Sequence, residues 1–105
     1  MAEVLTIDEL RNRIDIIDDQ LVRLLNVRVA CAVEVGRLKH GMGLPIYQPE
    51  REAQVLAAVR KSATELSGPL TAEAVVRIFE RIIDEARRAE RESSSRDNIG
   101  SSIGE

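Results

Sequence analysis

The sequence has 105 residues and a formal net charge of −3, with 44% hydrophobic and only 2% aromatic residues. This length predicts one domain, and the interspersed acids and bases leave no basic patch for binding nucleic acid. The shortage of aromatic side chains argues against base stacking, and no apolar run approaches the ~18 residues of a membrane-spanning helix.

The first residues and the rare residue types indicate where the protein works. Residues 1–6 are expected to be a short leader, which contains an acid, Glu3, and lacks the apolar core of a signal peptide. The single cysteine, Cys31, lies on the apolar side of a predicted helix and is expected to be buried in a reducing cytoplasm. Because His40 is the only histidine, the sequence predicts no metal site. We therefore expect a cytoplasmic protein.

The first predicted element is a long helix over residues 7–40. Thr6 and Glu9 match a capping box, which marks the start of the helix. Apolar residues then recur at spacings of three and four, as in a helix that buries one stripe. The stripe consists of Ile7, Leu10, Ile14, Ile17, Leu21, Leu24, Cys31, Val35 and Leu38. Since a helix of ~50 Å is too long for the rest of the chain to cover, the stripe predicts an obligate homodimer.

Arg28 interrupts this stripe, where a guanidinium group is unfavourable unless an anion meets it. About three turns further on, Lys39 lies on the same side of the helix, ~16 Å away along the axis. Ala32 and Val35 lie between the two cations and are small enough to leave a hollow. Arg11 points ~100° away from Arg28, so the helix presents cations on two faces.

Glycines and a proline separate the first helix from the second. Gly41 and Gly43 are expected to end the first helix, and an extended connection follows. Pro49 suits the first position of the second helix, and acids follow it at the positive end of the helix. This helix is expected to end near Thr64.

A third helix is predicted after a loop that contains Gly68. Thr71 is expected to cap this helix, which runs to about Glu92. Its inner face consists of Val75, Ile78, Phe79, Ile82, Ile83 and Ala86. Residues 93–105 are polar and rich in serine, so we expect a disordered tail without a function. The predicted fold class is all-α, with three helices per chain.

A few polar residues lie on the inner faces of these helices. Gln48, Arg51 and Glu52 share one face at the start of the second helix, and Glu90 extends the apolar face of the third. The full set of inward polar residues is Arg11, Arg28, Lys39, Gln48, Arg51, Glu52 and Glu90. Cations dominate, and the set contains no Ser–His or Cys–His pair. It therefore suits a small dianion held by guanidinium groups, rather than nucleophilic or metal catalysis.

These residues belong to a longer pattern that resembles the all-helical chorismate mutases over about residues 7–92. The matching segments are Leu10–Arg11, Ile14–Asp18, Leu24–Leu25, Arg28, Val33–Gly36, Lys39, Pro45–Glu52 and Ile78–Ile83. The resemblance implies an intertwined homodimeric helical bundle with two equivalent active sites shared between the chains. It also implies an isomerase that rearranges chorismate to prephenate in phenylalanine and tyrosine synthesis, without a cofactor or covalent intermediate.

The resemblance further implies roles for the cations. Arg28 and Arg51 would bind the substrate carboxylates, and Arg11 would reach in from the other chain. Lys39 would donate to the ether oxygen, on which negative charge builds as the bond breaks. The different faces of Arg11 and Arg28 suit a site that two chains share.

The remaining site residues include two departures from the family pattern. Glu52 would hold the ring hydroxyl of the substrate, and Gln48 would line the site. Ala86 stands where the best-known members have serine, so a hydrogen bond to a carboxylate is missing or made by water. Glu90 stands where many members have glutamine, facing the ether oxygen. Because a carboxylate there would repel the developing charge, we hypothesise that Glu90 is catalytic in its neutral form, with a pKa raised by burial.

The sequence leaves several alternatives open. A shifted register of the third helix would turn Arg87 or Glu85 to the site. An isochorismate pyruvate lyase on the same scaffold would have a shorter connection than Gly41–Gln48. A non-catalytic helical dimerisation module would use the same stripe, but it gives no reason for the clustered cations. The sequence predicts an enzyme that stands alone and lacks a domain for feedback control, and it leaves open a partner enzyme of the same pathway.

Overall fold

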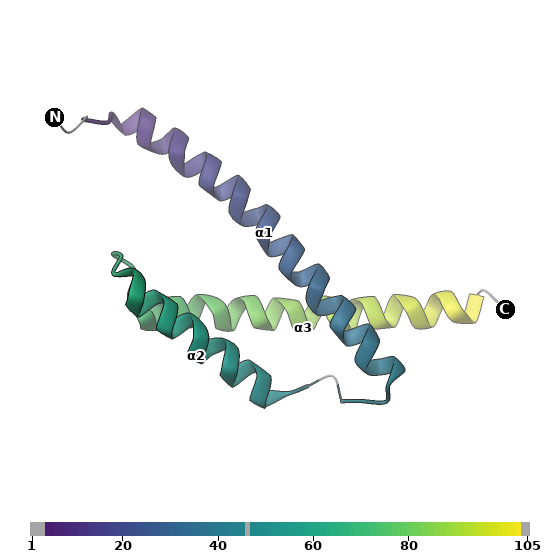
Figure 1. Ribbon diagram of the computed structural model, residues 1–105. Coiled ribbons are helices and arrows are strands. Elements are labelled where there is room, and N and C mark those ends of the chain that lie inside the picture. The colour runs from purple at the N-terminus through teal and green to yellow at the C-terminus, as the bar shows by residue number, and fades with distance from the viewer. Residues whose placement is uncertain (1–3, 46, 104–105) are drawn as a thin grey trace.

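The computed structural model describes residues 4–45 and 47–103, with side chains described through residue 95. Within these residues the chain forms three helices and no strand (Figure 1). They are α1 (Ile7–Gly41), α2 (Pro49–Leu66) and α3 (Ala72–Ile103). The predicted all-α fold with three helices is therefore confirmed. None of the helices in this part of the chain combines the length and the apolar content needed to cross a membrane.

Local hydrogen bonds define the start of α1, and glycines mark its end. The Thr6 hydroxyl accepts from the Glu9 amide at 3.1 Å, and the Thr6 amide donates to the Glu9 carboxylate at 3.0 Å, as the capping box predicts. The helix ends at Gly41, and Gly43 follows with a φ of +71°. This left-handed conformation favours glycine because a Cβ would clash with the backbone.

Helices α2 and α3 form a hairpin. Pro49 begins α2 as expected, but the helix ends at Leu66, slightly beyond the predicted Thr64. The Thr71 hydroxyl accepts from the Ala74 amide at 3.1 Å and so caps α3. Across the hairpin, Arg60 of α2 pairs with Glu73 of α3.

The C-terminal part of α3 differs from the expected disordered tail. The helix does not stop near Glu92 but continues to Ile103. The reason is cooperativity: once a helix is nucleated, each further residue adds a backbone hydrogen bond, and this gain does not require an apolar side chain. The final two residues of the expected tail lie outside the described residues. A boundary of the functional domain at residue 92 stays a prediction.

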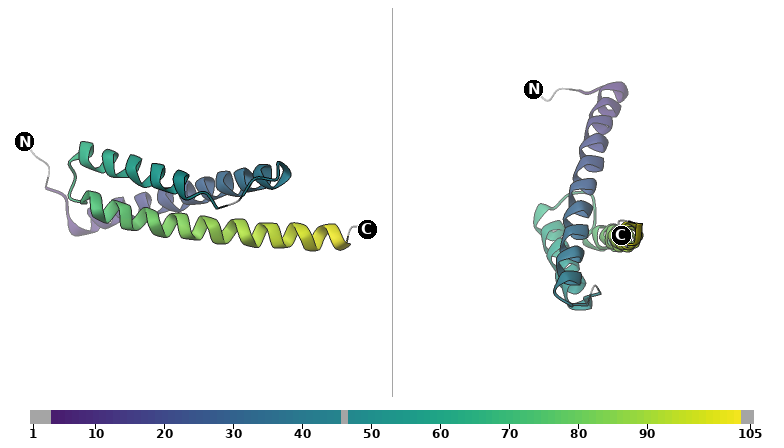
Figure 2. Two further views of the ribbon diagram at one scale, coloured as in Figure 1. Left: turned by 90° about the horizontal axis from the view of Figure 1, so that it is seen from below. Right: turned by 90° about the vertical axis from the view of Figure 1, so that its right-hand side faces the viewer.

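The three helices do not form a closed bundle. Helix α3 packs against both α1 and α2, while the first half of α1 projects away from the other helices (Figures 1 and 2). The radius of gyration is 18.6 Å, compared with ~13 Å for a compact domain of this length. Among the described side chains, the only buried apolar ones are Ile83 and Ala86 of α3.

Helix α1 consequently exposes a large apolar surface. Its exposed apolar side chains are Ile7, Leu10, Ile14, Ile16, Ile17, Leu21, Val22, Leu24, Leu25, Val27, Val35 and Leu38. Cys31 is exposed as well, contrary to the expectation that it is buried. The reason is that α2 and α3 leave much of the α1 surface uncovered. We call this surface the α1 apolar face.

Candidate active site

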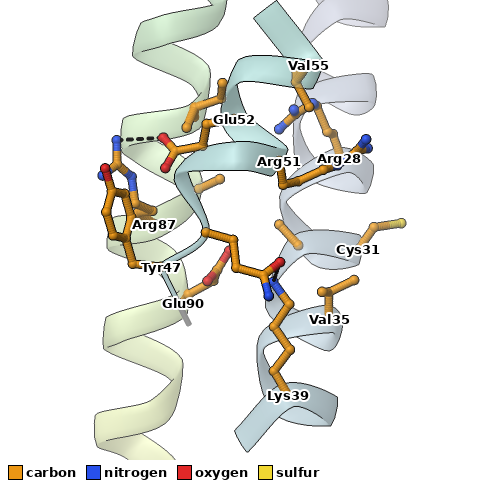
Figure 3. Close-up of a pocket in the computed structure, with 14 residues that line it drawn as sticks. Arg28, Cys31, Val35, Lys39, Tyr47, Arg51, Glu52, Val55, Arg87 and Glu90 are labelled. Carbon is orange, nitrogen blue, oxygen red and sulfur yellow. Dashed lines mark hydrogen bonds and ion pairs between the residues drawn. The ribbon is translucent and has the colours of Figure 1, made fainter. Parts of the chain in front are cut away.

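The three helices surround a hollow of about 300 Å³, a size suited to a small molecule (Figure 3). It is lined by every predicted site residue except Arg11. These residues are Arg28 and Lys39 of α1, Gln48 before α2, Arg51 and Glu52 of α2, and Ala86 and Glu90 of α3. Residues far apart in the sequence thus form one polar site, which we call the interhelical pocket.

Arg28 and Lys39 lie on the α1 wall of the pocket, with Ala32 and Val35 also lining it. Arg28 is half-buried, and its guanidinium carbon lies 5.8 Å from the centre of the Phe79 ring on α3. A cation–π interaction at this distance is favourable. It helps to explain how a cation is accommodated within an otherwise apolar stripe.

The cations of the pocket differ in how they are partnered. The Lys39 ammonium donates to the side-chain oxygen of Gln48 at 3.0 Å. Over the described part of the chain, neither Arg28 nor Arg51 forms an ion pair with a carboxylate. Two guanidinium groups in one pocket therefore remain available for an anionic ligand, which they can bind through paired hydrogen bonds.

Glu90 is the acid of the pocket whose pKa is shifted. Burial raises the pKa of Glu90, because desolvation disfavours the charged form. The positive charges of Lys39, Arg87 and Arg91 act in the opposite direction, while the negative charge of Glu52 raises this pKa further. The direction of the shift agrees with the hypothesis that Glu90 acts as a neutral acid.

Gly36 of α1 lies next to this acid. A Cβ added to Gly36 would lie 3.4 Å from the Oε2 atom of Glu90 and 3.6 Å from its Cγ and Cδ atoms. The Glu90 carboxyl group thus lies beside the α1 backbone, at a distance where a Cβ at residue 36 would be in ordinary van der Waals contact with it. Close contact with a helix backbone limits the access of water to that group, which contributes to the burial that shifts its pKa.

The pocket is also lined by the polar side chains of Tyr47, which sequence reasoning missed, and of Arg87, which it offered only as an alternative. The register alternative is only partly right, because Arg87 joins Ala86 and Glu90 at the pocket, whereas Glu85 pairs with Arg81 at 2.9 Å. Arg87 neighbours a predicted site residue on the same helix, and this was the available signal. Tyr47 belongs to the connection, where no helical periodicity indicates its direction.

Arg11 does not join the other site residues within one chain. It lies on the exposed first half of α1, ~25 Å from Arg28 along the helix axis. No side chain spans that distance. The expectation that Arg11 comes from the other chain therefore stays a prediction.

Comparison with protein families identifies the class. The profile of the family described as chorismate mutase type II matches residues 10–91. The chain belongs to this family. The matched range includes every predicted site residue, from Arg11 to Glu90.

Individual relatives agree with this assignment. The chain is 43% identical to the T-protein of Enterobacter agglomerans over 89 residues, which are 85% of this chain and 21% of that protein. It is 43% identical to a bifunctional chorismate mutase/prephenate dehydratase of Neisseria gonorrhoeae over 90 residues, which are 82% of this chain and 24% of that protein. The chain thus spans about a fifth to a quarter of the length of these curated relatives.

A solved structure shows the same fold over most of both chains. The chain resembles a chorismate mutase (form II) from Thermus thermophilus with a TM-score of 0.74 and 33% sequence identity. The superposition covers 81% of this chain and 93% of the Thermus chain.

Proposed function

We propose that the chain is a chorismate mutase, an isomerase that converts chorismate to prephenate on the route to phenylalanine and tyrosine. The observation that carries this proposal is the meeting of Arg28, Lys39 and Arg51 in one interhelical pocket, beside a half-buried acid. Chorismate is a small dianion, and three cations in a partly enclosed pocket suit such a ligand.

The rearrangement is intramolecular, so its atoms balance without a co-reactant. One carbon–carbon bond forms while the carbon–oxygen bond of the ether breaks, and no proton is gained or lost. The enzyme therefore has to fold the substrate into a compact conformer and stabilise the negative charge that builds on the ether oxygen. Arg28 and Arg51 serve the first task by holding the two carboxylates, and Lys39 serves the second.

The two carboxyl groups of the pocket complete the proposed site. Glu52 accepts a hydrogen bond from the ring hydroxyl of chorismate, while Gln48 orients Lys39 through the hydrogen bond between their side chains. Glu90, with a pKa raised by burial, donates to the ether oxygen as a neutral acid. Ala86 leaves its part of the wall without a polar group.

A second copy of the chain covers the α1 apolar face in our proposal. Monomeric proteins rarely expose an apolar surface of this extent, and the elongated single chain has little core of its own. A homodimer would bury this face and bring Arg11 of each chain toward the pocket of the other. The expected cytoplasmic location rests on the sequence and stays a prediction.

The test is a spectrophotometric assay of the purified chain, with prephenate identified as the product. Arg28→Ala should abolish turnover while the dimer stays folded, because an unpaired substrate carboxylate would remain in the pocket. Arg23→Ala is the matched control, since Arg23 is an exposed arginine of the same helix, and its one ion pair within the described residues is with Asp19 at 2.8 Å.

The assay also separates the alternatives. Release of salicylate and pyruvate from isochorismate, without prephenate formation from chorismate, would identify the lyase. A folded dimer that turns over neither substrate would identify a dimerisation module. Unchanged activity of Arg28→Ala would contradict the proposed site.

A further inference from the structure

Arg87 forms a bridge between α3 and α2 at the edge of the interhelical pocket. Its Nη2 atom lies 3.0 Å from a carboxylate oxygen of Glu52 on α2, and 2.8 Å from a carboxylate oxygen of Asp84 on its own helix. The guanidinium carbon also lies 5.5 Å from the centre of the Tyr47 ring. The connection, α2 and α3 each therefore hold this guanidinium group (Figure 3).

Its carboxylate partners distinguish Arg87 from the other cations of the pocket. Arg28 and Arg51 carry no carboxylate partner within the described residues, whereas Arg87 already neutralises Glu52. Figure 3 shows Glu52 between Arg87 on one side and Arg28 and Arg51 on the other. A substrate carboxylate would thus meet the two unpaired guanidinium groups before it met Arg87.

The chemistry of the substrate indicates what the bridge achieves. Chorismate with both carboxylates ionised has one hydrogen-bond donor, its ring hydroxyl, and this donor needs an acceptor. The side-chain oxygen of Gln48 already accepts from Lys39, and burial raises the pKa of Glu90 toward a protonated form. Glu52 is therefore the acceptor that suits the hydroxyl.

We propose that Arg87 is a positioning residue: it holds one oxygen of Glu52, so that the other oxygen faces the pocket and accepts from the substrate hydroxyl. A carboxylate on a flexible side chain loses rotamer freedom when it binds, and an ion pair formed beforehand removes part of that loss. The Tyr47 ring restricts the guanidinium group in turn. This inference rests on the proposed function, because it specifies how the same pocket recognises chorismate.

A double-mutant cycle tests whether Arg87 acts through Glu52. The values of kcat/KM for chorismate are measured for the wild type, Arg87→Met, Glu52→Ala and the double variant. Arg87→Met should lower kcat/KM about tenfold, the effect of weakening one hydrogen bond to a charged group. Most of the loss should appear in KM, because the hydroxyl contact exists in both the bound substrate and the transition state. In the Glu52→Ala background, Arg87→Met should change kcat/KM by less than about twofold.

Arg88→Met is the matched control, because Arg88 is the next arginine of α3 and, among the described residues, pairs only with Glu92 on the exposed side. This variant should retain the wild-type kcat/KM. Thermal denaturation shows whether each variant folds. If Arg87→Met does not fold, Arg87→Lys replaces it: the lysine keeps the charge but cannot stack on Tyr47 or contact two carboxylates as a guanidinium can. Its smaller loss should also vanish in the Glu52→Ala background.

The outcomes separate this inference from the proposed function. Equal losses from the Arg87 substitution with and without Glu52 would mean that Arg87 acts directly on the substrate, and would overturn the positioning role. An unchanged kcat/KM in Arg87→Met would overturn it as well. A wild-type chain that forms no prephenate would instead refute the proposed function, and the inference with it.

Discussion

Replacing Glu90 by glutamine should make the activity independent of pH in a range where the wild type loses activity. Glu90 is half-buried, and desolvation raises its pKa above the ordinary glutamate value of about 4.3. In the proposed function, the protonated carboxyl group donates to the ether oxygen, whereas the carboxylate repels the charge that develops there. An amide donates at every pH, so Glu90→Gln should show a level profile.

The size of the effect follows from the protonated fraction. Above the pKa of Glu90, this fraction falls tenfold per pH unit, so the wild-type rate should fall about 100-fold over two units. Lys39 from α1, together with Arg87 and Arg91 from α3, lowers this pKa, and Glu52 from α2 raises it. A bound dianion adds negative charge and raises it further. The alkaline limb should therefore lie at higher pH in kcat than in kcat/KM.

The assay is the initial rate of chorismate loss across the pH range, measured for both proteins at low and saturating substrate. A wild-type rate that stays level from acid to alkaline pH would refute the reasoning. So would a Glu90→Gln profile that keeps the alkaline limb of the wild type, because another group would then be titrating.

The same shift predicts how stability depends on pH. Between the unfolded-state pKa and the raised folded-state pKa of Glu90, the folded chain binds more protons than the unfolded chain. The free energy of unfolding should therefore decrease as the pH rises through this window, and the loss should be complete above the folded-state pKa. Glu90→Gln removes this contribution, so its Tm should exceed that of the wild type more at high pH than at low pH.

Three further substitutions test other parts of the structure. Gly36→Ala should stabilise α1 by ~0.5–1 kcal/mol, because alanine favours helix more than glycine does. Its Cβ, 3.4 Å from Glu90, should also bury the Glu90 carboxyl group further and raise its pKa. The alkaline limb of the activity profile should therefore move to higher pH. Ala86→Ser adds a hydroxyl to the pocket wall and should lower KM about 2- to 10-fold, the effect of one added hydrogen bond, in steady-state assays. Ile14→Glu places a charge on the α1 apolar face, so in the proposed dimer it should give an inactive monomer by light scattering, whereas Asn12→Glu should leave the proposed dimer intact.

Features set by neighbouring residues were predictable from the sequence. Thr6 with Glu9, Pro49 and Thr71 mark the starts of the helices through hydrogen bonds or backbone restraints that involve only a few consecutive residues. The spacing of Arg28 and Lys39 placed both on one face of α1, and the structure shows them lining one pocket. These inferences need only the helical repeat.

Features that depend on how helices approach one another were not predictable in the same way. Tyr47 lines the pocket although it lies outside the helices, and Arg87 reaches Glu52 only because α2 and α3 form a hairpin at a particular distance. The end of α3 was misplaced because polar turns carry no strong stop signal, and helix propagation then decides where the helix ends.

Residue order alone was sufficient to predict three helices and the polar, cation-rich faces that line the pocket, since both follow from periodicity along single helices. The ion pair between Arg87 and Glu52, the contact of Gly36 with Glu90, and the burial that raises the pKa of Glu90 required the folded chain. Each of these depends on a distance between helices, and such a distance is set by side-chain packing across the whole chain rather than by any local pattern.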